Sequence, residues 1–240
     1  MREIQLNGYI DDEVWCGDEI TPEAVRDLLN AGEGDPMEDL HITLNSYGGS
    51  CNAATQIHDM LCNYPGRVEL TVSGTAASAA TVVAMAADEL RMTAGSLFMI
   101  HDPICFAMGN ERDMLDAVNT LRAHKEAIIN TYQVRCRQGR DEISRLMSEE
   151  TWMDSKEALE RGFIDCIEEK SGAKGGASNR EDALRRVKNW YDRQRARPAA
   201  QAHIDEVEKK DVGNTDGKPR VDARERRLRL MKLHGDWKGE

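Results

Sequence analysis

The chain has 240 residues and a mass of 26.9 kDa, with 40% apolar and 31% charged residues. This composition excludes collagen-like and fully disordered chains, and its longest apolar stretch, Thr81 to Ala87, is far shorter than the roughly 18 residues of a membrane span. Residues 1–170 contain 14 basic and 31 acidic side chains, and this acidic balance argues against nucleic acid as a ligand of that part.

Strands and helices alternate along the first 170 residues. Apolar residues at helical or strand spacing define each element, and Gly or Pro marks most of the ends. Thr21 followed by Pro22 is a typical helix start, with a capping hydroxyl and a proline in the first turn. In chain order the prediction is strand 4–9, helix 22–31, strand 40–46, helix 50–64, strand 67–74, helix 79–87, further strand residues within 90–101, helices 111–137, 141–147 and 155–162, and strand 163–169.

This alternation predicts an α/β domain with a mostly parallel sheet, covering residues 1–170. After Ser171 the composition changes to glycine, polar and charged residues, with 18 basic and 12 acidic side chains in 171–240. The second region is therefore predicted to be a charged, partly helical or disordered extension.

The strongest local feature is the segment Gly74 to Ala80, GTAASAA, between a predicted strand and a predicted helix. Such a turn places Ser78 at a helix amino terminus, where free N–H groups favour developing negative charge. The small neighbours would let a substrate backbone approach the hydroxyl. The competing interpretation is that Ser78 only caps the helix.

Two further segments also follow strands. Asn45 to Ser50, NSYGGS, exposes backbone N–H groups that can bind an oxyanion, although the same pattern can bind phosphate or simply turn the chain. His101 closes the apolar strand LFMI and is the best candidate for a general base, with a structural histidine as the alternative.

Together these segments resemble the ClpP-type serine peptidases of the ClpP/crotonase superfamily. LNSYGGS, GTAASAA, FMIHDP and TWMDSKEALERGFID occur in the family's order over residues 4–170. The resemblance implies a spiral of repeated β-β-α units, a helical handle region formed by residues 111–137, and a homo-oligomeric ring. It also implies hydrolysis of peptide bonds without metal or cofactor.

Carried over residue by residue, the resemblance implies that Ser78 is the nucleophile and His101 the base. The backbone N–H of Ala79, with that of Gly48 or Gly49, would form the oxyanion hole.

Substrate-binding residues also follow from the resemblance. Ser50, and Ile104, Cys105 and Phe106 beyond the histidine, match strands between which the family holds an extended peptide. Recognition would be by strand addition, in which main-chain hydrogen bonds hold the substrate.

The third member of the triad departs from the family, where it is an aspartate. Counting back from TWMDSKEALERGFID places Glu150 there, with Glu149 and Asp154 as neighbouring rivals. A glutamate can orient an imidazole in the same way, although it is one methylene longer.

The first strand begins almost at Met1, without the axial segment and helix that precede it in ATPase-coupled members of the family. With the charged extension, this resembles the phage and prophage branch. We therefore expect a prohead protease that cleaves capsid or scaffold protein, without an AAA+ ATPase partner.

The cysteine pattern and the N-terminal composition indicate where in the cell the protein is located. The six cysteines show neither CxxC nor Cys/His metal spacing, and the N-terminal residues show no signal or transit character. These features predict reduced thiols and a cytoplasmic location, in a bacterial host or a phage prohead, without membrane contact.

Four alternatives remain at this point. An ATPase-coupled Clp proteolytic subunit would share the whole site. A crotonase-type acyl-CoA enzyme would use carboxylates for proton transfer. A peptidase that activates serine with lysine would need one of Lys125, Lys156 or Lys170 beside Ser78. An inactive capsid-assembly scaffold would keep the fold alone.

Overall fold

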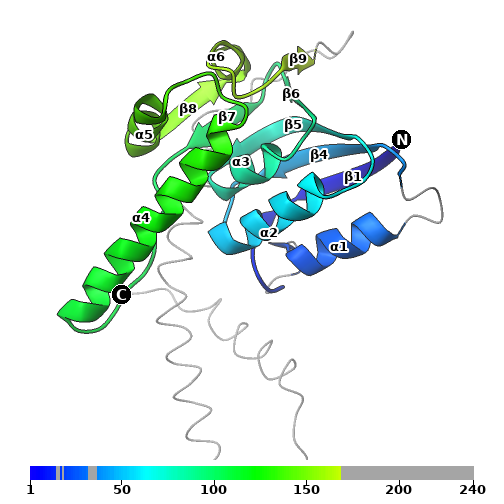
Figure 1. The fold of residues 1–240 in the computed structure, drawn as a ribbon. Helices are drawn as coiled ribbons and strands as arrows, with labels where there is room; N and C mark the ends of the chain where they lie inside the picture. Colours follow the sequence, from blue (N-terminus) through cyan, green and yellow to red (C-terminus); the bar gives the residue numbers. More distant parts are fainter. Residues whose placement is uncertain (15–16, 18, 32–36, 169–240) are drawn as a thin grey trace, which may run out of the picture. The chain divides into compact units, whose positions relative to one another are not determined.

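The computed structural model describes residues 1–14, 17, 19–31 and 37–168 (Figure 1). The predicted extension, residues 171–240, lies outside the described residues.

Strands and helices alternate in the described part much as the sequence predicts. The strands are β1 (Arg2–Asn7), β2 (Tyr9–Ile10), β3 (Glu19–Ile20), β4 (Leu40–Ser46), β5 (Val68–Ala77), β6 (Glu89–Thr93), β7 (Leu97–Ile100), β8 (Thr151–Asp154) and β9 (Cys166–Glu168). The helices are α1 (Pro22–Asn30), α2 (Cys51–Cys62), α3 (Ala79–Ala84), α4 (Glu111–Gln133), α5 (Arg140–Ser148) and α6 (Ser155–Glu160).

Seven strands form the main sheet. β1, β4, β5, β6 and β9 lie side by side in that order and are all parallel. β7 is parallel to β5, and β8 pairs with β7 in the antiparallel direction. The predicted α/β class with a mostly parallel sheet is therefore confirmed.

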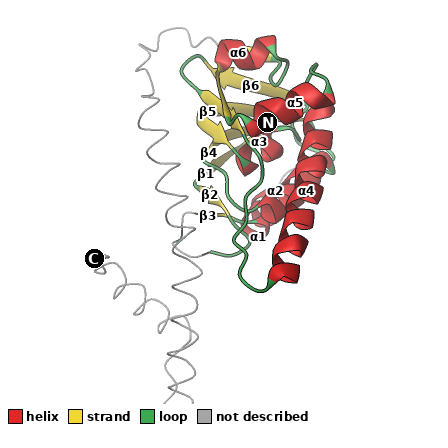
Figure 2. Cartoon of the chain, turned by 90° about the vertical axis from the view of Figure 1, so that its left-hand side faces the viewer, coloured by secondary structure: helices red, strands yellow, loops and turns green. Residues whose placement is uncertain are grey.

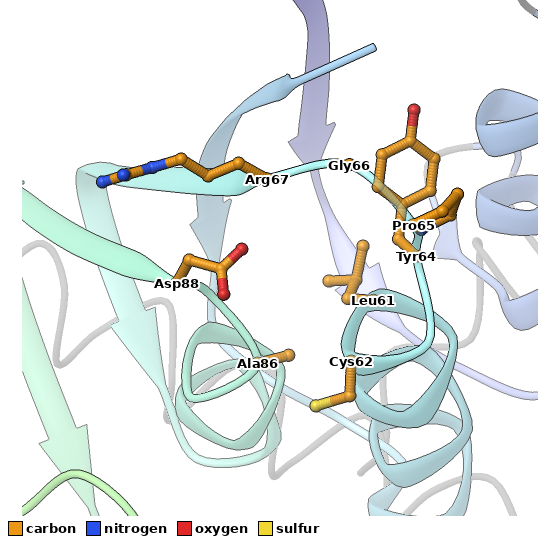
Figure 3. Close-up of a pocket in the computed structure, with 8 residues that line it drawn as sticks. All are labelled: Leu61, Cys62, Tyr64, Pro65, Gly66, Arg67, Ala86 and Asp88. Atoms are coloured by element: carbon orange, nitrogen blue, oxygen red, sulfur yellow. The ribbon is translucent and has the colours of Figure 1, made fainter. Parts of the chain in front are cut away.

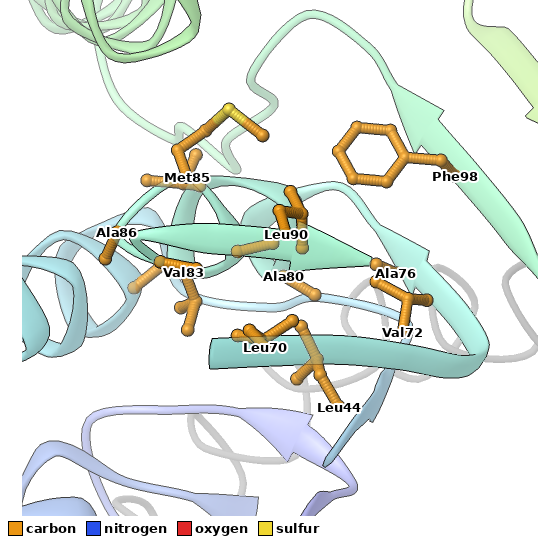
Figure 4. Packing of buried hydrophobic residues seen from close by; sticks show 14 of the residues in the cluster. Leu44, Leu70, Val72, Ala76, Ala80, Val83, Met85, Ala86, Leu90 and Phe98 are labelled. Atoms are coloured by element: carbon orange, nitrogen blue, oxygen red, sulfur yellow. The ribbon is translucent and has the colours of Figure 1, made fainter. Parts of the chain in front are cut away.

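The core lies on one face of the sheet. Along β4 the residues alternate between buried and half-buried positions, as expected for a strand with one covered face. Helices α1, α2, α3 and α4 lie on the same side of the sheet in Figure 2. Figure 4 shows Leu44, Leu70 and Leu90 from the strands packing against Ala80 and Val83 of α3. Burial of these side chains contributes most of the free energy that holds the helices in place.

A bulge in β5 positions the functional end of the sheet. The register with β4 shifts between Leu44, which pairs with Val72, and Ser46, which pairs with Ala76. At the bulge Gly74 has φ +117°, and its N–H donates to the buried Ser96 hydroxyl at 3.0 Å. The same edge of β5 pairs with β6 before the bulge and with β7 after it.

This change of partner divides the strand-forming segment predicted at residues 90–101. The segment contains two strands, β6 and β7, because each pairs with a different half of β5. The short strand β8 was not predicted. Its four residues carry too short a pattern to be distinguished from the start of the following helix.

Helix α4 runs past the edge of the sheet (Figure 1). Only Ile129 and Tyr132, near its carboxyl end, are buried, whereas Leu115 and Val118 near its amino end are exposed. The helix is therefore anchored to the core at one end only, within the described residues.

Candidate active site

Ser78 lies directly between β5 and α3, on the strand-turn-helix that the sequence predicts. Its backbone has φ 57° and ψ −127°, and its N–H donates to the Met99 carbonyl at 2.9 Å. The Ser78 side chain makes no capping hydrogen bond to α3. The alternative in which this serine only caps the helix is therefore wrong.

The Ser78 hydroxyl instead meets the imidazole of His101, with 2.7 Å between Oγ and Nε2. β7 brings the two together, because Ala77 pairs with Met99 and the next residues leave adjacent parallel strands at the same end. Carboxyl ends of parallel strands are where α/β sheets place ligands. The contact is within the range for proton transfer between a nucleophile and a base.

Burial lowers the pKa of His101 from its ordinary value of 6.5, while the charges of Glu150 and then Asp102 oppose this shift. Desolvation disfavours the charged imidazolium, and a nearby carboxylate favours it. At neutral pH the imidazole is therefore neutral, and Nε2 can accept the serine proton.

Glu150 lies next to His101 in register, just before the antiparallel strand β8. Ile100 pairs with Thr151, so the residues just beyond this pair are His101 on one side and Glu150 on the other. Trp152 Nε1 lies 3.4 Å from Glu150 Oε1. Of the two carboxylates whose charges oppose the lowering of the His101 pKa, Glu150 has the larger effect, ahead of Asp102.

The two rival acids are engaged elsewhere. Glu149 forms an ion pair with Arg145 at 2.5 Å. Asp154 accepts hydrogen bonds from the first N–H groups of α6 and pairs with Leu97, at the far end of β7 from His101.

Ser78 and Glu150 share a backbone feature. They are the non-glycine residues with positive φ in the part of the chain that the structure describes, at 57° and 51°. Such conformations cost on the order of 1–3 kcal/mol each and persist where the surroundings enforce them, often at active sites.

The Gly48-Gly49 loop lies against the nucleophile turn. A Cβ on Gly48, whose φ is +90°, would lie 2.5 Å from the Ala77 carbonyl oxygen and 2.8 Å from the Ala79 nitrogen. Glycine is therefore required for the loop to approach Ala79 this closely.

The hydrogen bonds of the loop distinguish its two amides. The Gly48 N–H donates to the buried Ser46 hydroxyl at 3.1 Å. Gly49 and Ile10 form a parallel β-bridge. The Ile10 N–H donates to the Gly48 carbonyl, and the Ser50 N–H donates to the Ile10 carbonyl. In this pattern the Gly49 N–H points away from Ile10. The sequence left both glycines open as oxyanion donors, and this pattern favours Gly49. The sequence did not indicate that Ser46, a buried polar residue in an alternating strand, accepts a hydrogen bond from this loop.

The predicted substrate-binding residues are not in strands. Ser50 caps α2, and its Oγ donates to Asp12 at 2.7 Å. Ile104, Cys105 and Phe106 are exposed and belong to an irregular segment. The predicted strands here are wrong, because residues 102–108 find no strand partner within the described chain.

The sequence did not reveal the contacts of Lys125, a polar residue near the site. Its Nζ lies 2.7 Å from Asp102 Oδ1 and donates to Ser148 Oγ at 2.9 Å. This places Lys125 beside Asp102 and away from a role as the base of a lysine-activated serine.

A surface cavity of about 450 Å³ lies elsewhere. Figure 3 shows Cys62, Arg67 and Asp88 on its walls. Arg67 precedes β5 whereas Ser78 follows it, so the cavity is at the opposite end of that strand from the serine. It therefore has no part in the chemistry of Ser78.

The described residues offer neither a metal-binding cluster nor a membrane-spanning helix. No group of three or more His, Cys, Asp or Glu side chains there is arranged to hold a metal ion. None of the helices in the same residues is both long and apolar enough to cross a membrane.

Comparisons with known proteins agree with the geometry. An ATP-dependent Clp protease proteolytic subunit from Leuconostoc citreum is 29% identical over 177 residues, which cover 72% of this chain and 86% of the relative. A protein of the same name from Streptococcus pneumoniae is 27% identical over 170 residues, or 69% of this chain and 84% of the relative. The Clp protease family matches residues 2–171. The chain therefore belongs to the Clp protease family and is a serine-type peptidase.

Proposed function

We propose that Ser78, His101 and Glu150 form the catalytic triad of this peptidase. The observation that carries the proposal is the 2.7 Å contact between Ser78 Oγ and His101 Nε2. Glu150 would hold the imidazole and balance its positive charge, as the acid does in other serine hydrolases.

The chemistry follows from these positions. Ser78 Oγ attacks the carbonyl carbon of the scissile bond while its proton passes to His101 Nε2, and the carbonyl oxygen becomes an oxyanion held by the N–H groups of Gly49 and Ala79. When the C–N bond breaks, the imidazolium gives this proton to the leaving amine, which leaves an acyl-enzyme. Water then repeats the sequence and releases the second product and Ser78.

The irregular segment after His101 supports an extended peptide as substrate. Ile104 to Met108 make no backbone hydrogen bonds to other elements of the described chain. Their N–H and C=O groups can therefore pair with a substrate strand, with Ile104, Cys105 and Phe106 lining its path. Ser50, held at the start of α2, would lie on the other side of this strand.

We further propose that the active form is a homo-oligomeric ring. Met114, Leu115 and Val118 are partly exposed along the free end of α4. Apolar residues left on one part of a helix often mark an interface.

For the physiological role we propose ATP-independent processing of a capsid or scaffold protein. Residues 172–240 lie outside the family match and carry a basic excess, which suits a role beyond the shared peptidase domain. The names of the two relatives favour a second candidate, the proteolytic subunit of an ATP-dependent Clp protease.

One experiment separates these two roles. The purified full chain is incubated with a capsid precursor and, separately, with a folded test protein, a Clp ATPase and ATP. Cleavage of the precursor without nucleotide supports the first role. Degradation of the folded protein only when both ATPase and ATP are present overturns it in favour of the second.

The triad itself is tested with Ser78→Ala. We expect peptidase turnover to fall at least about 10³-fold, because the nucleophile is lost, while the fold persists. A fluorophosphonate should label Ser78 in the unaltered chain, identified by mass spectrometry, and should not label the variant. Retained turnover in Ser78→Ala would reject the assignment.

A further inference from the structure

Two buried hydroxyls lie behind the nucleophile turn. Thr81 of α3 is 0% exposed and Tyr132 of α4 is 1% exposed. Their oxygens are 2.6 Å apart, and Thr81 Oγ1 donates to the Ser78 carbonyl oxygen at 2.5 Å. Because the single hydroxyl proton of Thr81 goes to that carbonyl, Tyr132 must be the donor in the first bond. The hydrogen bonds therefore run in one direction, from Tyr132 through Thr81 to Ser78.

The Ser78 carbonyl receives a second donor from the same residue, because the Thr81 N–H also bonds to it at 3.0 Å. Two donors hold the carbonyl in one direction more firmly than one. Burial strengthens the pair, since water does not compete for either hydroxyl.

This carbonyl shares a peptide plane with the Ala79 N–H. The peptide unit is planar and trans, so its C=O and N–H point in opposite directions. Fixing the Ser78 carbonyl against Thr81 therefore fixes the Ala79 N–H on the opposite side. Ser78 has φ 57° and ψ −127°, a sparsely populated conformation that needs such external contacts to persist.

We propose that Thr81 and Tyr132 are positioning residues for peptide hydrolysis, which orient the Ala79 N–H as an oxyanion donor through the Ser78 carbonyl. The inference rests on the proposed roles of Ser78 and Ala79. Neither hydroxyl touches the substrate. Their effect is expected in the transition state, where charge develops on the carbonyl oxygen.

A buried hydroxyl pair also stabilises the fold, so the test needs readouts that stability alone does not change. Thr81→Val keeps the shape and removes the hydroxyl, whereas Thr81→Ser keeps the hydroxyl. Tyr132→Phe removes only the terminal donor. Tyr64→Phe is the matched control, because the Tyr64 hydroxyl donates to the Glu38 carbonyl at 2.7 Å, away from the site.

Steady-state kinetics on a fluorogenic peptide and inhibition by a peptide boronate, which forms a tetrahedral adduct with serine, provide the readouts. We expect Thr81→Val to lower kcat about 10- to 100-fold with KM within about twofold, and to weaken boronate binding by a similar factor. Thr81→Ser should restore kcat to within about threefold, and Tyr132→Phe should lower it about three- to tenfold.

The double variant tests the direction of the chain. Because Tyr132 acts through Thr81, adding Tyr132→Phe to Thr81→Val should lower kcat no further, whereas independent roles would multiply the two effects.

Unchanged kcat and boronate affinity in folded Thr81→Val, or an equal loss in Tyr64→Phe, would overturn the inference. If Thr81→Val does not fold, Tyr132→Phe provides the same test. Ser78→Ala distinguishes failure of the proposed triad from failure of the positioning role. If it retains turnover, the triad is rejected, but if it is inactive while Thr81→Val is fully active, only the positioning role is rejected.

Discussion

The two ends of the main sheet are held by different forces. At the amino end of β5, Arg67 and Arg91 form ion pairs with Glu69 and Glu89, and the strands keep a regular register. At the carboxyl end, after the bulge at Gly74, the sheet instead contains buried hydroxyls and residues with positive φ.

The contrast shows which end of the sheet contains strained backbone and which does not. Partly exposed ion pairs contribute little each and tolerate change, whereas a strained turn persists only because the surrounding packing and hydrogen bonds enforce it. Substitutions at the carboxyl end should therefore affect turnover strongly, and those at the amino end should affect stability weakly.

The largest effect after loss of the nucleophile is expected from Gly48→Ala. The new methyl group would lie 2.5 Å from the Ala77 carbonyl oxygen and 2.7 Å from Ser78 Cβ, which displaces the nucleophile turn. We expect turnover to fall at least about 100-fold, as for loss of an oxyanion donor, measured with a fluorogenic peptide.

Gly17→Ala is the matched control. Gly17 has φ +94°, close to the +90° of Gly48, but no atom of the residues that the structure describes lies within 4 Å of its added Cβ. Backbone strain should cost Gly17→Ala about 1 kcal/mol and leave turnover within about twofold. A similar loss of turnover in both variants would show that strain, and not contact with the turn, is responsible.

A second, smaller effect is expected from Glu150→Gln. Removing this carboxylate should lower kcat/KM about 10- to 100-fold, because the imidazolium loses its counter-charge. The charge of Glu150 raises the pKa of His101, so its removal lowers that pKa, and the acid limb of the pH profile should move to lower pH.

Glu149→Gln provides the comparison for this variant, since Glu149 is paired with Arg145. It should change neither kcat/KM nor the acid limb by more than about twofold. If Glu149→Gln has the larger effect, the third position of the triad belongs to that residue.

Much of the carboxyl end could be predicted because its residues follow strands directly. Ser78 and His101 each come after an apolar run, and parallel strands deliver such residues to one edge. Glu150 was reached only by counting along the resemblance, because β8 is too short to give a periodic pattern.

The features that could not be predicted depend on residues far apart in the chain. The Thr81–Tyr132 bond joins residues 51 positions apart, and the bulge at Gly74 uses the side chains of Ser96 and Asn45, 22 and 30 positions from their partners. Local pattern contains no information on such pairs. Buried threonine and tyrosine in apolar stretches were the available signals, and these usually indicate core packing alone.

The smallest effect is expected at the amino end of the sheet, from Glu89→Gln. The hydrogen bond from Arg91 is the main cause that holds the pKa of Glu89 below its ordinary value, so its carboxylate stabilises the fold above that value. The side chain is partly exposed, which limits the contribution to below about 1 kcal/mol. As the pH falls through the lowered pKa, the carboxylate becomes protonated in the unaltered chain and the difference from Glu89→Gln disappears. Thermal unfolding at pH 7 and at acid pH, each at low and high salt, measures this difference.

Glu3→Gln is the control on the same sheet face, because the exposed Glu3 makes no ion pair within the described residues. Its stability at pH 7 should match that of the unaltered chain, and both variants should keep full turnover. A loss of turnover in Glu89→Gln would mean that the two ends of β5 are coupled, because the change would have to pass the bulge to reach Ser78. Unchanged turnover with a small, salt-sensitive loss of stability is what the contrast between the two ends requires.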